Sequence, residues 1–62
     1  SNPEQIKFIN YSIRSIAECV SCLYLSRKRN YISDEEFLIA YQKAEELFAK
    51  SNKFRNRLRG GN

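Results

Sequence analysis

Apolar residues recur at alternating intervals of three and four on both sides of one short polar break, and this pattern constrains the fold most. Such spacing follows one face of an α-helix, whereas a β-strand would need a repeat of two. Before the break the series is Ile6, Ile9, Ile13, Ile16, Val20 and Leu23. After the break, with one serine in an apolar place, it is Phe37, Ala40, Ala44, Leu47, Ser51, Phe54 and Leu58. The sequence therefore predicts two long helices.

The break itself, "YISDEEF" over residues 31–37, has the signals of a helix start. Ser33 is expected to cap the second helix, with Glu36 as its reciprocal partner in a capping box. Ile32 and Phe37 take the two positions of a hydrophobic staple. Asn30 tolerates the left-handed conformation that often follows a helix. These signals predict a sharp turn between the helices.

The predicted elements form one domain over residues 1–62, because a chain of this length makes one domain at most. Asn2 as a cap and Pro3 as the first helical residue suit the start of the first helix, and Gly60-Gly61 suits the end of the second. The bounds that we predict are a helix at about 3–29, a turn at 30–33 and a helix at about 34–58.

Folding the two apolar series against each other predicts an all-α, antiparallel two-helix hairpin. Two helices alone cannot enclose a core, and each helix has a further apolar or small-residue face that needs cover. We therefore expect half of a four-helix bundle, completed by oligomerisation into a homodimer or a higher oligomer. The predicted oligomer interface consists of Phe8, Ser12, Ser15, Cys19, Cys22, Leu38, Tyr41 and Phe48.

Positive charge is concentrated at the end of the second predicted helix. The net charge of the chain is +4, and residues 50–59 contain five basic residues and no acidic one. The candidate phosphate-binding residues are Lys50, Lys53, Arg55, Arg57 and Arg59. Such a segment suits RNA or DNA. The alternative is a solvated helix end whose charge complements the helix dipole. Because Phe54 belongs to the apolar series, no aromatic residue is left for base-specific contacts.

The residue types favour neither an enzyme nor a metal or cofactor site. The chain has no histidine, and its two cysteines, in Cys19-Val-Ser-Cys22, lie in mid-helix, where a redox thiolate lacks stabilisation from the helix N-terminus. Zinc needs four ligands, and one hairpin offers two thiols. The cysteines are expected to be small packing residues. No apolar run is long enough to cross a membrane and no signal peptide is visible, so we expect a cytoplasmic protein.

From Phe8 to Leu58 the chain resembles the four-helix-bundle protein family that includes ribosomal RNA intervening-sequence proteins and accessory proteins of diversity-generating retroelements. The residues that carry the resemblance are Ser15 and Glu18, in a Ser-x-x-Glu pattern, and Tyr31, Ile32, Ser33, Glu36 and Phe37 at the turn. Asn30 stands where glycine is usual. The resemblance covers only the C-terminal half of the family, because its first two helices are absent. It implies a half-bundle, ring-like pentamers with basic surfaces, nucleic-acid binding in some members, and no enzymatic activity.

Two hypotheses for the function follow. The first is a non-enzymatic assembly module that self-associates and presents its basic end to nucleic acid or a ribonucleoprotein. The second is a protein-binding hairpin, or a fragment of a longer four-helix bundle, with no nucleic-acid role. Salt-dependent binding to RNA or DNA distinguishes the two.

Overall fold

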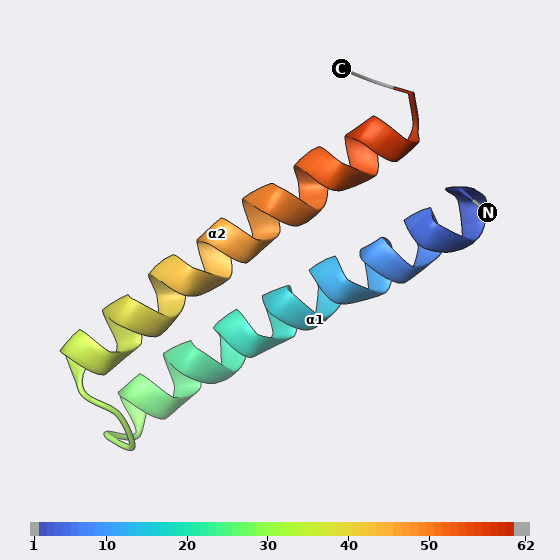
Figure 1. Ribbon diagram of the computed structural model, residues 1–62. Helices are drawn as coiled ribbons and strands as arrows, with labels where there is room; N and C mark the ends of the chain where they lie inside the picture. The colour runs from blue at the N-terminus through green and yellow to red at the C-terminus, as the bar shows by residue number, and fades with distance from the viewer. Residues whose placement is uncertain (1, 61–62) are drawn as a thin grey trace.

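The computed structural model of the chain describes residues 2–60. It contains helix α1 (Asn2–Lys28) and helix α2 (Asp34–Leu58). The two helices run antiparallel, and both ends of the chain lie at the same end of the hairpin (Figure 1). The predicted all-α hairpin is confirmed. Of the predicted glycine stop, Gly60 has a left-handed φ of 79°, and Gly61 lies outside the described residues.

The end of α1 closes in a hydrogen-bonding pattern that needs a left-handed residue. The backbone N–H of Tyr31 donates to the carbonyl of Ser26 at 2.9 Å, and the N–H of Asn30 donates to the carbonyl of Arg27 at 3.0 Å. These two bonds form a Schellman motif. Asn30 itself has φ of 62°, as the sequence predicted. Asparagine accepts this conformation more readily than most residues because its short side chain can bond locally.

The start of α2 is the predicted capping box. The Ser33 Oγ accepts a hydrogen bond from the Glu36 N–H at 3.0 Å, and a Glu36 carboxylate oxygen accepts one from the Ser33 N–H at 2.8 Å. The backbone and side-chain hydrogen bonds with Ser33 lower the pKa of the Glu36 carboxyl below its ordinary value. A serine cap contributes about 1 kcal/mol to helix stability. The turn is therefore defined on both sides by local bonds.

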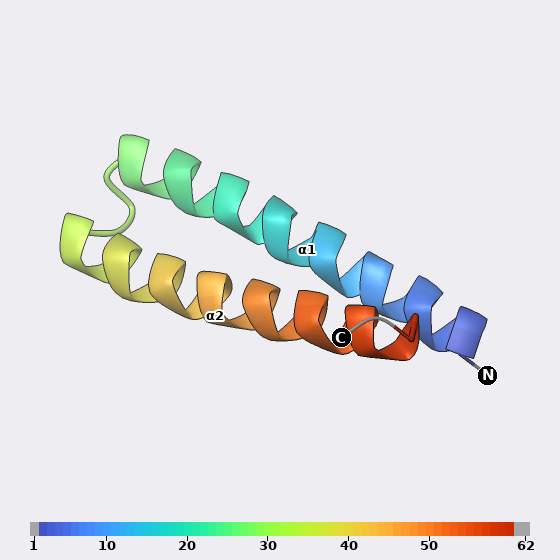
Figure 2. The same ribbon diagram turned by 90° about the horizontal axis from the view of Figure 1, so that it is seen from above.

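The hairpin is a single layer of helices, with principal extents of 43 × 18 × 11 Å (Figure 2). Among the described residues only Ile9 and Phe37 are buried, at 9% and 6% exposure. The predicted α1 series is confirmed, because all six of its members are buried or half-buried. So small a buried set follows from the geometry, since each helix has one neighbour and leaves most of its circumference uncovered.

The predicted α2 series is only partly right. Leu47 and Phe54 are 56% and 51% exposed, while Tyr41, Asn52 and Arg55, which are not members of the series, are half-buried. A straight helix has 3.6 residues per turn, so a series with a strict seven-residue repeat drifts by about 20° per heptad. Over α2 this drift turns the series toward one side of the contact with α1, and Leu47 and Phe54 come to lie beyond it.

The two ends of the hairpin are held by different chemistry. Next to the turn, the rings of Tyr24, Phe37 and Tyr41 lie 5.0–6.0 Å apart, and the Arg27 guanidinium lies 4.0 Å from the centre of the Phe37 ring. At the other end, polar side chains join the helices.

Arg55 forms the main polar link between the helices at the end that carries the termini. Its Nη1 donates to the Asn10 Oδ1 and its Nη2 donates to the Asn52 Oδ1, both at 2.6 Å. Asn2, predicted as a cap, is the first residue of α1, and its side-chain amide donates to the Leu58 carbonyl at 3.4 Å. Hydrogen bonds between side chains therefore join the helices at this end, whereas packed aromatic rings join them at the turn end.

Candidate assembly groove and basic end

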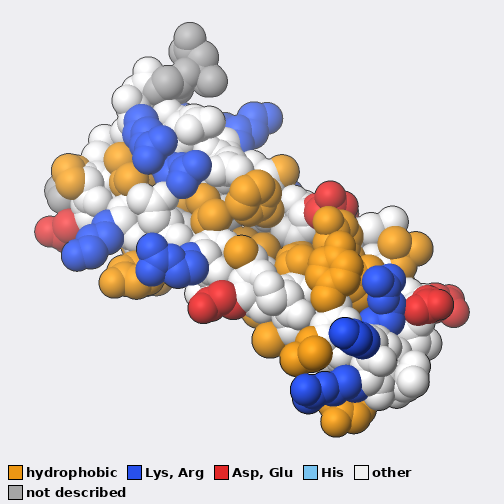
Figure 3. All heavy atoms as spheres, turned by 180° about the vertical axis from the view of Figure 1, so that it is seen from behind, with side chains coloured by type: hydrophobic (Ala, Val, Ile, Leu, Met, Phe, Trp, Pro, Cys, Tyr) orange, Lys and Arg blue, Asp and Glu red, His pale blue; other side chains and the backbone are white. Residues whose placement is uncertain are grey.

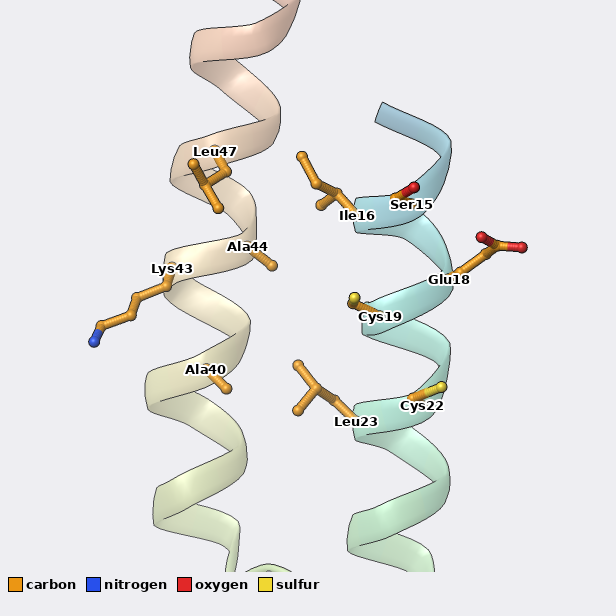
Figure 4. A pocket seen from close by; sticks show the side chains of 10 residues that line it. All are labelled: Ser15, Ile16, Glu18, Cys19, Cys22, Leu23, Ala40, Lys43, Ala44 and Leu47. Atoms are coloured by element: carbon orange, nitrogen blue, oxygen red, sulfur yellow. The ribbon is translucent and has the colours of Figure 1, made fainter. Parts of the chain in front are cut away.

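An apolar groove of about 730 Å³ runs between the two helices on one side of the hairpin. Small residues contribute to it, because Ala40 and Ala44 on α2 and Ser15 and Cys19 on α1 line it with little side-chain volume. Ile16, Leu23 and Leu47 complete its floor and walls (Figure 4). The view shows the side chains of Ile16 and Leu23 pointing toward α2. An uncovered apolar groove of this kind marks an interaction surface.

Two opposite charges stand at the outer edges of this groove. Glu18 lines it on the α1 side, and Lys43 lines it on the α2 side. In Figure 4 both side chains point outward, away from the facing helix. The groove therefore has an apolar centre with one negative and one positive edge.

A second hollow, of about 340 Å³, lies along the contact between the helices. Ile16 and Ala44 line both the groove and this second hollow. These two residues lie where the helices meet, and the groove and the second hollow lie on opposite sides of them. The remaining lining residues of the second hollow are Ala17, Val20, Tyr41, Glu45 and Phe48. The hairpin therefore has two uncovered faces, of which the first is the larger.

The structure does not bring the predicted oligomer interface together on one surface. Ser15, Cys19 and Cys22 line the large groove, whereas Tyr41 and Phe48 line the second hollow. The other three predicted residues line neither: Phe8 and Leu38 are exposed, and the Ser12 hydroxyl donates to the Phe8 carbonyl at 3.2 Å. The prediction grouped the small residues of α1 with the large residues of α2 in a single interface. In the structure the small residues line the large groove, and Tyr41 and Phe48 line the second hollow.

The predicted phosphate-binding residues separate in a similar way. Lys50, Lys53, Arg57 and Arg59 are exposed, whereas Arg55 is half-buried and its guanidinium is bonded to Asn10 and Asn52. Arg55 is therefore occupied in holding the helices together. The exposed four remain candidates for contacts with phosphates.

The fold brings Lys7 and Arg14, which were not among the predicted phosphate-binding residues, to the same end of the hairpin as the basic run of α2. Because the helices are antiparallel, the start of α1 lies beside the end of α2 (Figure 1). Residues 2–14 and 50–60 together contain seven Lys and Arg residues and one acidic residue, Glu4. Residues 15–49 contain four basic and six acidic residues. Figure 3 shows Lys and Arg side chains at both ends of the hairpin, and those near the turn are followed in the sequence by Asp34, Glu35 and Glu36. The excess of positive charge is therefore at the end with the termini. We call this region the basic end.

One hollow at the basic end combines cations with an aromatic ring. Lys7, Asn10, Tyr11 and Arg14 line a depression of about 240 Å³ on α1. The Arg14 guanidinium lies 5.9 Å from the centre of the Tyr11 ring. The spacing of these residues, at i, i+3, i+4 and i+7, is the signal that could have identified them, because it places all four on one helix face.

The two cysteines are free thiols, and both are exposed. Both line the groove, and Figure 4 shows Cys19 directed toward α2 and Cys22 directed away from α2. Neither is buried within the single hairpin, and their packing in an oligomer stays a prediction. They are exposed because the single helical layer leaves their face of α1 uncovered. Within residues 2–60, neither helix is long and apolar enough to cross a membrane.

The fold defines this protein as a two-helix hairpin with an open apolar face and a basic end. A model of the family described as 23S rRNA-intervening sequence protein matches residues 1–53. The chain therefore belongs to this family, which confirms the resemblance seen in the sequence. Comparison with curated proteins and with solved structures gives no match.

Proposed function

We propose that this protein is a non-enzymatic cytoplasmic assembly module, whose copies associate through the large groove and whose basic end binds nucleic acid. The observation that carries the proposal is the groove itself. It is uncovered and apolar, and it lies on a hairpin in which only two of the described residues are buried. A chain of this size gains little stability from its own core, and oligomerisation is a common remedy.

The occupant that we propose for the groove is a second copy of the chain. A two-fold axis along the helices would place α1 of each copy over α2 of the other and complete four helices. Glu18 of one copy would then face Lys43 of the other, and the reverse contact would follow by symmetry. The charges at the groove edges support this arrangement, because the negative edge of each copy meets the positive edge of the other.

Leu47 is the residue whose burial would contribute most clearly to association. It lines the groove and is 56% exposed in the single hairpin. Fully burying a leucine side chain is worth about 1.5–3 kcal/mol. Two copies bury two such side chains, so removing them should affect assembly more than the fold of one hairpin.

Sedimentation at micromolar concentration tests this proposal. We expect an oligomer, and we expect Leu47→Glu to dissociate it while leaving the helical circular dichroism signal in place. The matched control is Ile39→Glu, which puts the same charge at a residue of α2 that is also half exposed, at 51%, and does not line the groove. A folded wild-type chain that stays monomeric would contradict the assembly proposal.

A charge exchange tests the relative orientation of the copies. Glu18→Lys alone and Lys43→Glu alone should each weaken association, because each places like charges opposite one another. The double variant restores opposite charges and should restore association. If the double variant is as weak as the sum of the single ones, the copies meet in a different orientation.

The nucleic-acid part of the proposal rests on the charge at the basic end and on the family match. The family description refers to 23S rRNA, and we therefore take RNA as the nucleic acid to test. Exposed Lys50, Lys53 and Arg57 would contact phosphates, so binding should depend strongly on salt and little on sequence. In the proposed dimer the basic ends of both copies lie at the same end, which doubles the positive charge presented to the RNA.

A further inference from the structure

We infer that the Lys7, Tyr11 and Arg14 face of α1 binds single-stranded nucleic acid, with a base stacked on Tyr11 and phosphates held by Lys7 and Arg14. The inference rests on the nucleic-acid part of the proposed function and assigns the contact to a particular site. That site is the 240 Å³ hollow at the basic end, whose lining contains two cations, an amide and a phenol, and no carboxylate.

The charge of the hollow is reinforced from behind by Arg55. The Asn10 Oδ1 accepts from the Arg55 Nη1 at 2.6 Å, so the amide hydrogens of Asn10 remain as donors. The Arg55 Nε is buried and has no hydrogen-bond partner, and the two acceptors of its guanidinium are neutral amides. The positive charge of Arg55 is therefore not cancelled by a bonded carboxylate, and it adds to the field that attracts an anion.

Tyr11 provides the stacking surface that phosphate contacts alone would lack. Its side chain is 59% exposed, and the Arg14 guanidinium lies near its ring. Proteins that bind single strands combine a positive groove with aromatic rings on which bases stack. Stacking on a side chain requires an unpaired base, so this site favours a single strand over a duplex.

The basic run of α2 has an exposed aromatic residue as well, but in a different place. Phe54 is one heptad beyond Leu47, and therefore lies on nearly the same side of α2 as the groove. A second copy bound in the groove would approach that side of α2 and leave less room for a base to stack on Phe54. Tyr11 is one heptad before Glu18, whose side chain points outward at the edge of the groove, and Tyr11 itself does not line the groove. Its ring therefore lies toward the edge of the proposed assembly and not at its centre.

The test is a titration of the full chain with a mixed-sequence, single-stranded RNA of about 12 nucleotides, a length within the range that small single-strand binding domains occupy. Tyr11→Ala should weaken binding about 5- to 150-fold, the effect of losing one stacked base. Tyr11→Phe keeps the ring and should bind like the wild type. The duplex of the same sequence should be insensitive to Tyr11→Ala.

The salt dependence of RNA binding tests whether Lys7 and Arg14 contact phosphates. Replacing Lys7 and Arg14 together with glutamine should reduce the slope of log K against log salt by about 1.4, as expected for two lost contacts with a single strand. The control replaces Lys28 and Arg29, which are exposed near the turn, and removes the same charge from the other end. Circular dichroism should show unchanged helix content in all variants.

The outcomes separate this inference from the proposed function. If the wild-type chain binds the RNA and both the Tyr11→Ala and the Lys7, Arg14 variants bind equally well, the inference is overturned and another part of the basic end makes the contact. If the wild-type chain does not bind at about 50 mM salt, where phosphate contacts are strong, the nucleic-acid function itself is overturned.

Discussion

The turn end and the basic end of the hairpin join the same two helices by opposite means. At the turn end, aromatic rings pack on one another, Phe37 is 6% exposed, and a Schellman motif and a capping box define the chain path. At the basic end, Ile9 is the one buried residue among those that the structure describes, and side-chain hydrogen bonds from Arg55 and Asn2 connect the helices.

The difference shows how stability and function are divided in so small a chain. Packed rings exclude water and hold their position, whereas exposed hydrogen bonds exchange readily with water and contribute little net free energy. The turn end is therefore expected to hold the hairpin together. Apart from Arg55, the basic end keeps its Lys and Arg side chains exposed, which a phosphate-binding surface requires.

The largest expected effect tests the turn end. Phe37→Ala removes the most buried side chain of the described chain and should lower the free energy of unfolding by about 3–5 kcal/mol. Thermal melting followed by circular dichroism measures this. Tyr31→Ala is the control, because Tyr31 is an aromatic residue near the same turn but 74% exposed. Equal losses in both variants would show that the ring cluster is not the core.

A smaller effect is expected at the basic end. Asn10→Ala removes the acceptor of the Arg55 Nη1 and should lower stability by about 0.5–1.5 kcal/mol, the usual net value of one hydrogen bond. Native-state hydrogen exchange should show faster exchange of amides in residues 52–58 and unchanged exchange around Phe37. Asn56→Ala, at an exposed position, is the control. Uniform faster exchange along both helices would contradict the division into two ends.

The smallest effect concerns the pH dependence of the turn end. The bonds with Ser33 lower the folded-state pKa of Glu36 below its ordinary value of 4.5, so the unfolded chain binds this proton more tightly. The stabilisation is therefore fully present above pH 4.5 and is lost as the pH falls through the lowered pKa. The melting temperature of Glu36→Gln, compared with the wild type across the acid range, measures it.

We expect the wild type to lose its advantage over Glu36→Gln as the solution is acidified. Glu35→Gln removes the same charge from the same helical turn without touching the capping box, and serves as the control. Wild-type and Glu36→Gln curves that stay parallel throughout the acid range would mean that the carboxylate adds nothing beyond a neutral amide in the capping box.

The sequence by itself determined the features that depend on neighbours along the chain. The two helices, the left-handed Asn30 and the capping box of Ser33 and Glu36 are set by bonds between residues at most five positions apart. The α1 apolar series could also be predicted, because the helical repeat places its isoleucines on one face of α1 whatever packs against that face.

Only the tertiary structure decided which side of each helix faces its neighbour. A rotation too small to see in a heptad pattern leaves Leu47 and Phe54 exposed and brings Arg55 into the contact, where it bonds to Asn10. The same antiparallel pairing places Lys7 and Arg14 at the basic end, far in sequence from the run that suggested it. The sequence predicted the antiparallel pairing, but the precise rotation of α2 depends on how the side chains of both helices pack, which signals between neighbours along one helix do not fix.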